Sequence, residues 1–266
     1  MDWWWAYLTL GAFVGFFSGL LGIGGGSAMV PVLVFIFTAK QFAPDHVLHI
    51  ALGTGMATIL FTSASSVISH HRHGAVNWRI LRDMVPGVVV GTFCGALLAG
   101  YLNVLVLGVM FTVLVYYSAT QLMLDAKPKA SRNLPGALGM SLAGSVIGAL
   151  SSLAAIAGAS LTVPFLVRRN VRVHEAIGTA AAVGWPLALA GTVGFVVSGI
   201  GKPGLPDYSV GFIYLPATSW IVIASMITAP LGARVAHRTP GALLKKIFAV
   251  LLYVLASNML WRLLQR

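Results

Sequence analysis

Long apolar runs separated by short polar segments dominate the chain. Each run holds about twenty residues, and a helix of that length crosses about 30 Å of hydrocarbon. Backbone N–H and C=O groups must be paired inside lipid, and a helix pairs them within one segment. The pattern therefore predicts an all-α polytopic membrane protein. The runs cover residues 4–22, 46–69, 79–100, 102–124, 136–157, 174–199, 210–235 and 242–264.

The first run contains a feature that interrupts a helix. Its end and the residues after it read GLLGIGGGSAMVPVL over positions 19–33. Only proline suits a helix interior less well than glycine does. We expect a helix over residues 4–22, a break at residues 22–26 and a second, returning element over residues 27–38. Twelve helical residues reach about 18 Å, so the returning element is predicted to be a half-helix.

The charged residues set the expected topology. They make up 9% of the chain, with a formal net charge of +11, whereas soluble domains hold about 25%. Most basic residues lie in short loops between apolar runs, and by the positive-inside rule these loops face the cytoplasm. Nucleic acid is therefore not an expected partner. The residues are Arg72, Arg79, Arg82, Lys127, Lys129, Arg132, Arg168, Arg169, Arg172, Arg234, Arg238, Lys245 and Lys246.

The remaining connections carry little charge and are expected outside, together with the N-terminus. The first run must then cross the membrane and return, as its break allows. The fifth run lies between two basic connections, so we expect it to be broken as well, near residues 157–160. Counting the membrane crossings from the N-terminus places the C-terminus outside as well, despite Arg262 and Arg266. The predicted location is the cell inner membrane, with multiple passes.

An internal repeat supports the two breaks. Residues around the first break recur at an offset of 133, and two further blocks recur at offsets of 125 and 137. Each half then holds five elements, an odd number, so the second half is inverted. Each half combines a broken, re-entrant-like first segment with three or four spanning helices. We expect a first transmembrane repeat over 1–124, a basic cytoplasmic linker over 125–135 and a second, inverted repeat over 136–266. Matching pairs include Gly11/Gly144, Gly15/Gly148, Ser27/Ser160, His49/His174, Thr54/Thr179 and Tyr116/Tyr253.

Inverted repeats with Gly-interrupted segments at matching positions are typical of secondary transporters, whose substrates bind where the broken helices meet. Glycine allows a sharp turn and a close approach of backbones. The N-terminus of a half-helix carries partial positive charge and free N–H groups, which suits an anion. The alternative interpretation is a tight turn or a packing face, like the ladder Gly11, Gly15 and Gly19 before it.

Neutral donors supply the candidate substrate-binding residues. Serine and threonine hydroxyls from both halves can donate to an anion, together with backbone N–H groups at the two breaks. Hydroxyls on membrane helices also bond to the preceding turn or serve helix packing, so both roles stay open. The candidates are Ser18, Gly24, Gly25, Gly26, Ser27, Thr54, Ser151, Ser152, Gly158, Ser160 and Thr179.

The acidic residues argue against a cation substrate. All six lie at predicted helix ends or in loops, so none is an obvious intramembrane ligand for a proton or sodium ion. Export or facilitated diffusion of an anion is favoured, because it requires no coupling ion. The six are Asp2, Asp45, Asp83, Asp125, Glu175 and Asp207.

Two histidines, His49 and His174, pair in the repeat and precede the Gly-Thr of each half. Either could be a protonatable gate, since histidine changes charge near neutral pH; the alternative is interfacial packing at helix starts. The cluster His70, His71 and His73 has no carboxylate or cysteine beside it, so no metal is expected. No cofactor is expected either.

Several motifs resemble one family of membrane permeases, the TauE/SafE or sulfite exporter family. They read GFFSGLLGIGGGSAMVPVL, HIALGTGMA and HHRHGAVNWRIL, with HEAIGTAAA as the second-half echo. The resemblance covers nearly the whole chain and implies transport of sulfite or small organosulfur anions such as sulfonates and sulfoacetate. Family members commonly keep a Gly-rich second break, whereas this chain has Ala155, Ala157 and Ala159 around Gly158.

Other functional classes have less support from the sequence. GFFSG does not have the G-x-S-x-G spacing, and the chain contains no HExxH, paired aspartates or cysteine cluster, so an enzyme is not expected. An anion channel, or a carrier for an unrelated small solute, is the main alternative. The expected partners are a small anionic substrate and the lipid bilayer, with a homodimer as one option.

Overall fold

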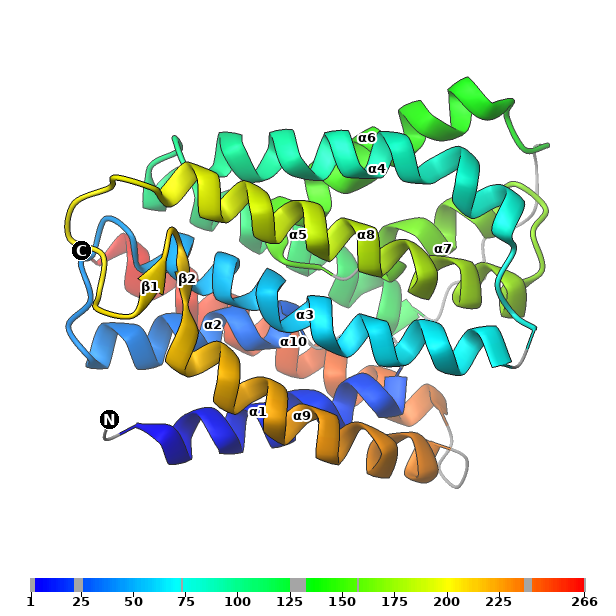
Figure 1. Ribbon diagram of the computed structural model, residues 1–266. Coiled ribbons are helices and arrows are strands. Elements are labelled where there is room, and N and C mark those ends of the chain that lie inside the picture. Colours follow the sequence, from blue (N-terminus) through cyan, green and yellow to red (C-terminus); the bar gives the residue numbers. More distant parts are fainter. Residues whose placement is uncertain are drawn as a thin grey trace.

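The structure, a computed structural model, describes residues 3–21, 26–72, 74–124, 133–156, 158–236 and 241–265. These residues form a helical bundle with one short β-hairpin (Figure 1). The helices are α1 Trp4–Leu21, α2 Gly26–Ala39, α3 Val47–Arg72, α4 Trp78–Ala99, α5 Val104–Leu124, α6 Ala137–Ala154, α7 Ala159–Arg168, α8 Val173–Gly199, α9 Leu215–Ala236 and α10 Gly241–Leu264; the strands are β1 Ser209–Val210 and β2 Ile213–Tyr214.

The predicted all-α class with helices of membrane-spanning length is confirmed, and the inverted repeat stays a prediction. Among the described residues, seven helices are long and apolar enough to cross a membrane. The shorter apolar helices are α2, with 14 residues, and α7, with 10. They are the half-helices expected after the two breaks, since α1 ends at Leu21 before α2 begins, and α6 ends at Ala154 before α7 begins.

The apolar run over 210–235 is not one helix, and this part of the prediction is wrong. Its first residues form the turn and second strand of the hairpin, in which Ser209 pairs with Tyr214. Gly211 in the turn has a φ of +56°, a left-handed backbone that stops a right-handed helix from forming. Helix α9 therefore begins only at Leu215.

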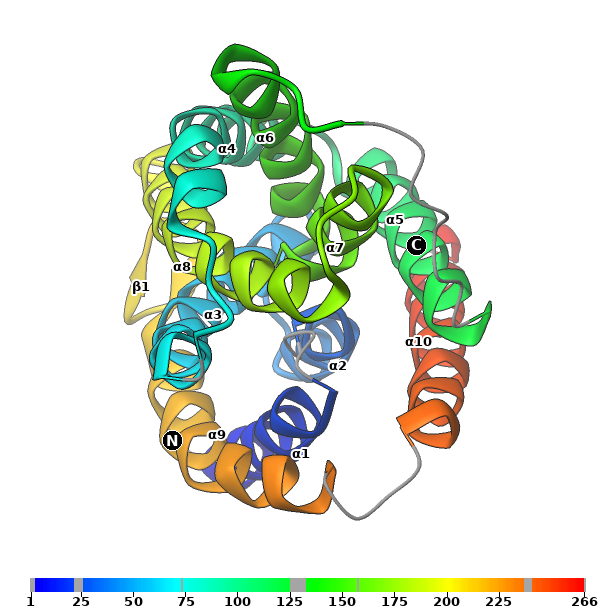
Figure 2. The ribbon, with the colours of Figure 1, turned by 90° about the vertical axis from the view of Figure 1, so that its right-hand side faces the viewer.

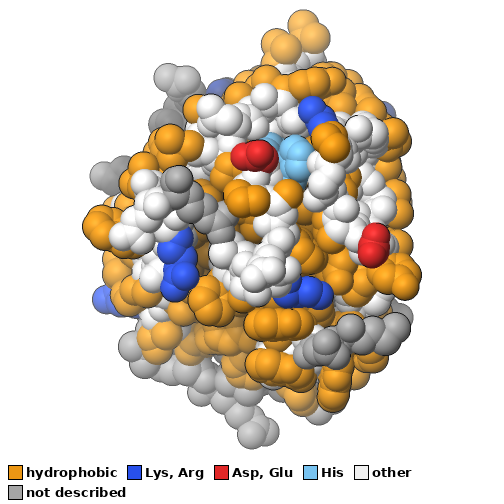
Figure 3. All heavy atoms as spheres, turned by 90° about the vertical axis from the view of Figure 1, so that its left-hand side faces the viewer, with side chains coloured by type: hydrophobic (Ala, Val, Ile, Leu, Met, Phe, Trp, Pro, Cys, Tyr) orange, Lys and Arg blue, Asp and Glu red, His pale blue; other side chains and the backbone are white. Residues whose placement is uncertain are grey.

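The two ends of the bundle differ in their connections (Figure 1). One end, here called the hairpin end, holds both termini, the loop 40–46 and the β-hairpin. The other, here called the basic end, holds the starts of α4 and α8, with Arg79 and Arg172. Figure 3 faces the hairpin end, where charged and histidine side chains lie scattered among hydrophobic ones. Each broken segment therefore starts and finishes at one end of the bundle.

Two half-helices occupy the interior. Viewed from the basic end, α2 and α7 lie between α3 and α8 on one side and α5 and α10 on the other (Figure 2). Helix α2 packs on α3 and α10, and α7 packs on α8 and α5. The outer helices form the close pairs α1 with α9 and α4 with α6.

Glycines set the closeness of these outer pairs. A Cβ atom added to Gly11 would lie 2.6 Å from the Ile221 carbonyl oxygen of α9. A Cβ atom added to Gly144 would lie at the same 2.6 Å from the Met84 carbonyl oxygen of α4. Both distances are too short for a real side chain, so the ladder predicted as a packing face is needed for helix contact.

Candidate functional site

The two helix breaks meet at the centre of the bundle. Gly26, the first residue of α2, lies against Ala155, the C-cap residue that follows α6. A Cβ atom on Gly26 would lie 2.2 Å from the Ala155 carbonyl oxygen and 2.6 Å from Cδ1 of Ile59 on α3. Both residues are buried. The sequence predicted that the breaks come together, and the chain segments that form them are in direct contact.

The second break contains two residues with positive φ, Ala155 and Gly158, rather than a glycine run. Ala155 has φ 46° and ψ 40°, and its N–H bonds to the Ser151 carbonyl. Gly158 has φ 36°, and its N–H donates to the Ile156 carbonyl at 2.8 Å. A left-handed conformation costs an alanine about 1–2 kcal/mol. Ala155 is fully buried, so packing on Gly26 holds it there.

Helix α7 presents an uncapped N-terminus at this break. Gly158 is its N-cap residue and makes no side-chain cap bond. The first N–H groups of a helix have no intrahelical acceptor, and they carry the positive end of the helix dipole. The Gly158 carbonyl accepts from Thr162 N at 2.8 Å, and the N–H groups of Ala159 and Ser160 have no acceptor among the described residues.

Two buried hydroxyls flank the break without a partner. Ser151 lies one turn before Ala155 on α6, and Thr162 lies in the first turn of α7. Each residue is fully buried, and its side-chain oxygen has no hydrogen-bond partner among the described residues. Because a buried hydroxyl without a partner is costly, these two donors are available for a ligand.

Helices α3 and α8 form walls beside the breaks. A Cβ atom on Gly55 of α3 would lie 3.4 Å from both Ala155 Cβ and Val30 Cγ2. A Cβ atom on Gly158 would lie 3.5 Å from Leu187 Cδ1 on α8. The surroundings of the breaks are therefore apolar and closely packed, and the polar groups are confined to the breaks.

The hydroxyl of Thr54 belongs to a different contact, at the hairpin end. Its oxygen accepts from the backbone N–H of Tyr214 at 3.1 Å. A Cβ atom on the preceding Gly53 would lie 2.4 Å from the Phe212 carbonyl oxygen. This Gly-Thr pair therefore holds the hairpin that leads into α9, and we call the contact the first clamp.

The hydroxyl of Thr179 forms the same contact at the basic end. It accepts from the backbone N–H of Asn77 at 2.9 Å. A Cβ atom on Gly178 would lie 2.4 Å from the Ala75 carbonyl oxygen. This second clamp holds the loop that leads into α4, and Glu175 of α8 accepts from the Asn77 side-chain amide. Both threonines are fully buried.

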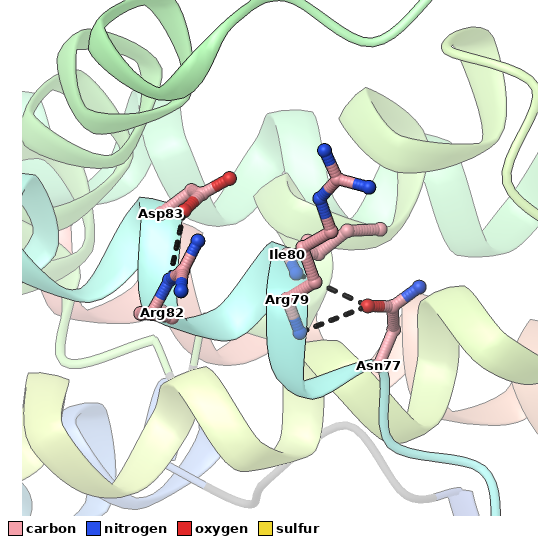
Figure 4. A network of polar contacts seen from close by, with 5 residues as sticks. All are labelled: Asn77, Arg79, Ile80, Arg82 and Asp83. Carbon is pink, nitrogen blue, oxygen red and sulfur yellow. Dashed lines mark hydrogen bonds and ion pairs between the residues drawn. The ribbon is translucent and has the colours of Figure 1, made fainter.

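Asn77 also starts helix α4 (Figure 4). Its side-chain oxygen accepts from the backbone N–H groups of Arg79 and Ile80, each at 3.1 Å. This is a regular N-cap. The neighbouring Arg82 pairs with Asp83 at 3.3 Å on the same helix. The motif ending in Asn-Trp thus positions a helix start, and the second clamp fixes that start to α8.

The remaining predicted hydroxyls lie in three environments. Ser27 is buried in the first turn of α2, beside Gly26. Ser160 and Ser18 are half-buried. The Ser152 hydroxyl donates to the Ala149 carbonyl at 2.8 Å and packs against Gly95 of α4, so it serves the contact between α4 and α6.

The two predicted gating histidines lie at opposite ends of the bundle. His49 is buried at the hairpin end, where Nε2 lies 3.0 Å from the Leu102 carbonyl oxygen and the ring stacks on Phe212. His174 is exposed at the start of α8. A gating role for either histidine stays a prediction.

Some site residues lie outside the described part of the chain, and others had no sequence signal. Gly24 and Gly25 lie outside the described residues, as does Ala157. Sequence reasoning missed Thr162, because its partner in the repeat is the apolar Met29 and the pairing argument favoured serines and threonines present in both halves. The sequence predicted that the breaks meet, but no sequence signal pointed to Ala155 as the residue that contacts Gly26.

Comparison with known proteins identifies the family of this fold. A family model described as sulfite exporter TauE/SafE matches residues 7–259. No solved structure matches the chain.

Curated relatives agree with the family model. A probable membrane transporter protein of Haemophilus influenzae is 38% identical over 253 residues, which cover 95% of this chain and 96% of that protein. The probable membrane transporter protein YdhB of Bacillus subtilis is 25% identical, over 87% of this chain and 90% of that protein. A probable membrane transporter protein of Methanocaldococcus jannaschii is 24% identical, over 95% of this chain and 94% of that protein. The chain is thus a multi-pass membrane transporter, and it belongs to the TauE/SafE sulfite exporter family.

Proposed function

We propose that the protein transports a small sulfur oxyanion or organosulfonate, of the sulfite, sulfonate or sulfoacetate class, and binds it between the two helix breaks. The observation that carries the proposal is the contact of Gly26 with Ala155, because it places the N-terminus of α2 against the break that precedes α7. Converging helix N-termini attract an anion through free N–H groups and their dipoles.

The polar groups around the breaks suit an anion better than a cation. Ser151, Thr162 and the first N–H groups of α7 are neutral donors. The described acidic residues lie elsewhere: Asp45 and Asp207 are exposed in loops, Asp83 pairs with Arg82 on α4, and Glu175 bonds to Asn77 at the basic end. A cation inside a membrane protein is usually met by a carboxylate, and none lies at these breaks among the described residues.

An inverted repeat supports alternating access. Tyr116 of α5 bonds to Ser257 of α10, and Tyr253 of α10 bonds to Thr120 of α5. Residues 116 and 253, and residues 120 and 257, are both related by the offset of 137. The two bonds run in antiparallel order, as expected for a two-fold axis perpendicular to the helices. Such an axis lies in the membrane plane, which is the symmetry of inverted-repeat transporters.

The two clamps support the same symmetry. Thr54 holds Tyr214 at the hairpin end, and Thr179 holds Asn77 at the basic end. Asn77 and Tyr214 are again 137 positions apart. Each half thus holds a segment of the other half by a hydrogen bond, at opposite ends of the bundle. If one half rocks against the other during transport, the two hydrogen bonds would be strained alternately.

Export is the favoured direction. With the basic end in the cytoplasm, as the positive-inside rule indicates, the hairpin end faces outward from the inner membrane. A monovalent anion that leaves the cell gains about 2.3 kcal/mol per 100 mV of inside-negative potential. No coupling ion is needed for this direction.

Uptake into proteoliposomes tests the proposal. Labelled sulfite, sulfoacetate, taurine and sulfate are offered to the purified protein at several imposed potentials. We expect one sulfur oxyanion or sulfonate to enter at a rate that follows the potential. Preloading the vesicles with unlabelled anion should accelerate entry, because only a carrier exchanges one substrate molecule for another. Transport of none of these anions would overturn the substrate class, and entry without exchange acceleration would favour an anion channel.

A further inference from the structure

A lysine enclosed by aromatic rings lies at the hairpin end, away from the helix breaks. Lys40 follows the last residue of α2 and is half-buried. Its Nζ lies 5.9 Å from the ring centroid of Tyr7, 5.6 Å from that of Phe42 and 5.2 Å from that of Tyr214. These four residues, from α1, the loop after α2 and β2, are here called the lysine cage.

The charge of Lys40 has no counter-charge in the described structure. Nζ donates a hydrogen bond to the Tyr214 hydroxyl at 3.2 Å. No carboxylate of the described residues lies within ion-pair distance of it. Aromatic faces and a hydroxyl stabilise an ammonium group but do not neutralise it. The remaining N–H bonds of the ammonium group are free to meet an anion.

A second donor in the cage is buried and has no partner. Tyr7 is 2% exposed, and its hydroxyl makes no hydrogen bond to any described residue. Its ring packs edge-on against that of Tyr214, with 6.3 Å between centroids. A buried phenol normally finds an acceptor, so the cage holds an ammonium group without a counter-charge and a hydroxyl donor without a partner.

We propose that the lysine cage is an anion-binding site at the outer end of the protein, separate from the helix breaks. Its ligand is a small oxyanion with an apolar side, such as an alkyl sulfonate. The anionic oxygens accept from Lys40 Nζ and the Tyr7 hydroxyl, and the apolar side packs against the ring of Phe42. A role in capturing or releasing transported substrate rests on the proposed function, whereas binding of the anion does not.

Among the described residues, the matching position at the opposite end of the bundle has different chemistry. Asn77 occupies the place in the second clamp that Tyr214 occupies in the first. The Asn77 amide donates to the carboxylate of Glu175, where Tyr214 accepts from Lys40. A carboxylate repels an anion, so the described residues of the second clamp do not form a second copy of the cage.

Chemical labelling of the lysines tests the site. The purified protein in detergent is acetylated with an N-hydroxysuccinimide ester, and mass spectrometry follows Lys40 and Lys202. Lys202 is the matched control, because it also lies at the hairpin end, is half-buried and stacks on a tyrosine, Tyr101, at 5.3 Å. Saturating methanesulfonate, with gluconate at equal ionic strength in the reference sample, should slow acetylation of Lys40 about fivefold or more. Lys202 should react at an unchanged rate.

Two variants sharpen the result. Tyr7→Phe keeps the ring and removes one donor, so we expect protection of Lys40 to need roughly tenfold more methanesulfonate. Ser27→Ala alters the helix break and should leave the protection of Lys40 unchanged. Equal slowing of both lysines, no slowing of Lys40, or loss of protection in Ser27→Ala would overturn the cage as a separate site. Protection of Lys40 in a protein that transports none of the sulfur anions would uphold the cage while the proposed function failed.

Discussion

At the scale of single residues, the absence of a side chain at Gly26 decides whether the two breaks can meet. The carbonyl oxygen of Ala155 occupies the space that a Cβ atom would need. The neighbour is backbone in a left-handed turn, so it cannot move aside by changing a rotamer. Ala155 itself has a left-handed backbone conformation, which is unfavourable for alanine. The contact between the two breaks therefore depends on a few main-chain atoms of Gly26 and Ala155.

Gly26→Ala is predicted to destabilise the protein by about 1–3 kcal/mol, because overpacking at a rigid contact forces the backbone apart. The measurement is thermal unfolding in detergent, together with transport at a temperature where the variant is folded. Gly136→Ala is the control, since a Cβ atom at Gly136 meets nothing within 4 Å. Unfolding of Gly26→Ala at the same temperature as the wild type would contradict the contact.

At the scale of elements, the two Gly-Thr motifs connect helices to the segments that enter the bundle. Their recurrence in both halves suggested a shared substrate site. In the structure they lie at opposite ends, and each threonine oxygen accepts a backbone N–H from the other half. The inverted repeat that we expect would pair the motif without bringing the two copies together, and a substrate contact for these two threonines stays a prediction.

Thr54→Val is predicted to cost about 1–3 kcal/mol of stability, because it leaves the buried N–H of Tyr214 without an acceptor. Thr54→Ser keeps the oxygen and should cost less. Hydrogen exchange would locate the change, with faster exchange of the Tyr214 amide in the valine variant than in the serine variant. Equal exchange in the two variants would mean that the clamp does not hold the hairpin.

Most of the element pattern could be predicted from the sequence, and the site could be predicted only in part. Membrane helices are long and uniformly apolar, so run length and the glycine break locate α1 and α2 well. The hairpin before α9 was missed, because Val210, Phe212 and Ile213 are as apolar as a helix. The contact of Gly26 with Ala155, and the orphaned hydroxyl of Thr162, depend on tertiary packing that no local pattern records.

At the scale of the whole molecule, both termini lie at the end of the bundle that carries few basic residues (Figure 1). The element order explains this, because α3, α4, α5, α8, α9 and α10 each run from one end to the other, and each broken segment returns to the end where it starts. The expected orientation places the hairpin end outside and the basic end in the cytoplasm.

Cysteine labelling tests this orientation. In a Cys94→Ser background, Lys202→Cys at the hairpin end is expected to react with a membrane-impermeant maleimide in unbroken cells, where the reagent reaches only the outer face of the inner membrane. Arg169→Cys at the basic end is expected to react only after the cells are opened. The reverse pattern would invert the protein, and the proposed direction of transport would then need to be re-examined.

Transport kinetics of variants at the breaks test the central claim most directly, namely that the anion binds where the two breaks meet. The measurement is the initial rate of potential-driven uptake against concentration, for the sulfur anion that the wild type carries. We predict that Ser27→Ala and Thr162→Val each raise KM about tenfold or more, since each loses a buried donor to an anion. Ser219→Ala, an exposed serine whose hydroxyl bonds to its own helix, should leave KM unchanged. Unaltered KM in both break variants, with the proteins folded, would contradict the account.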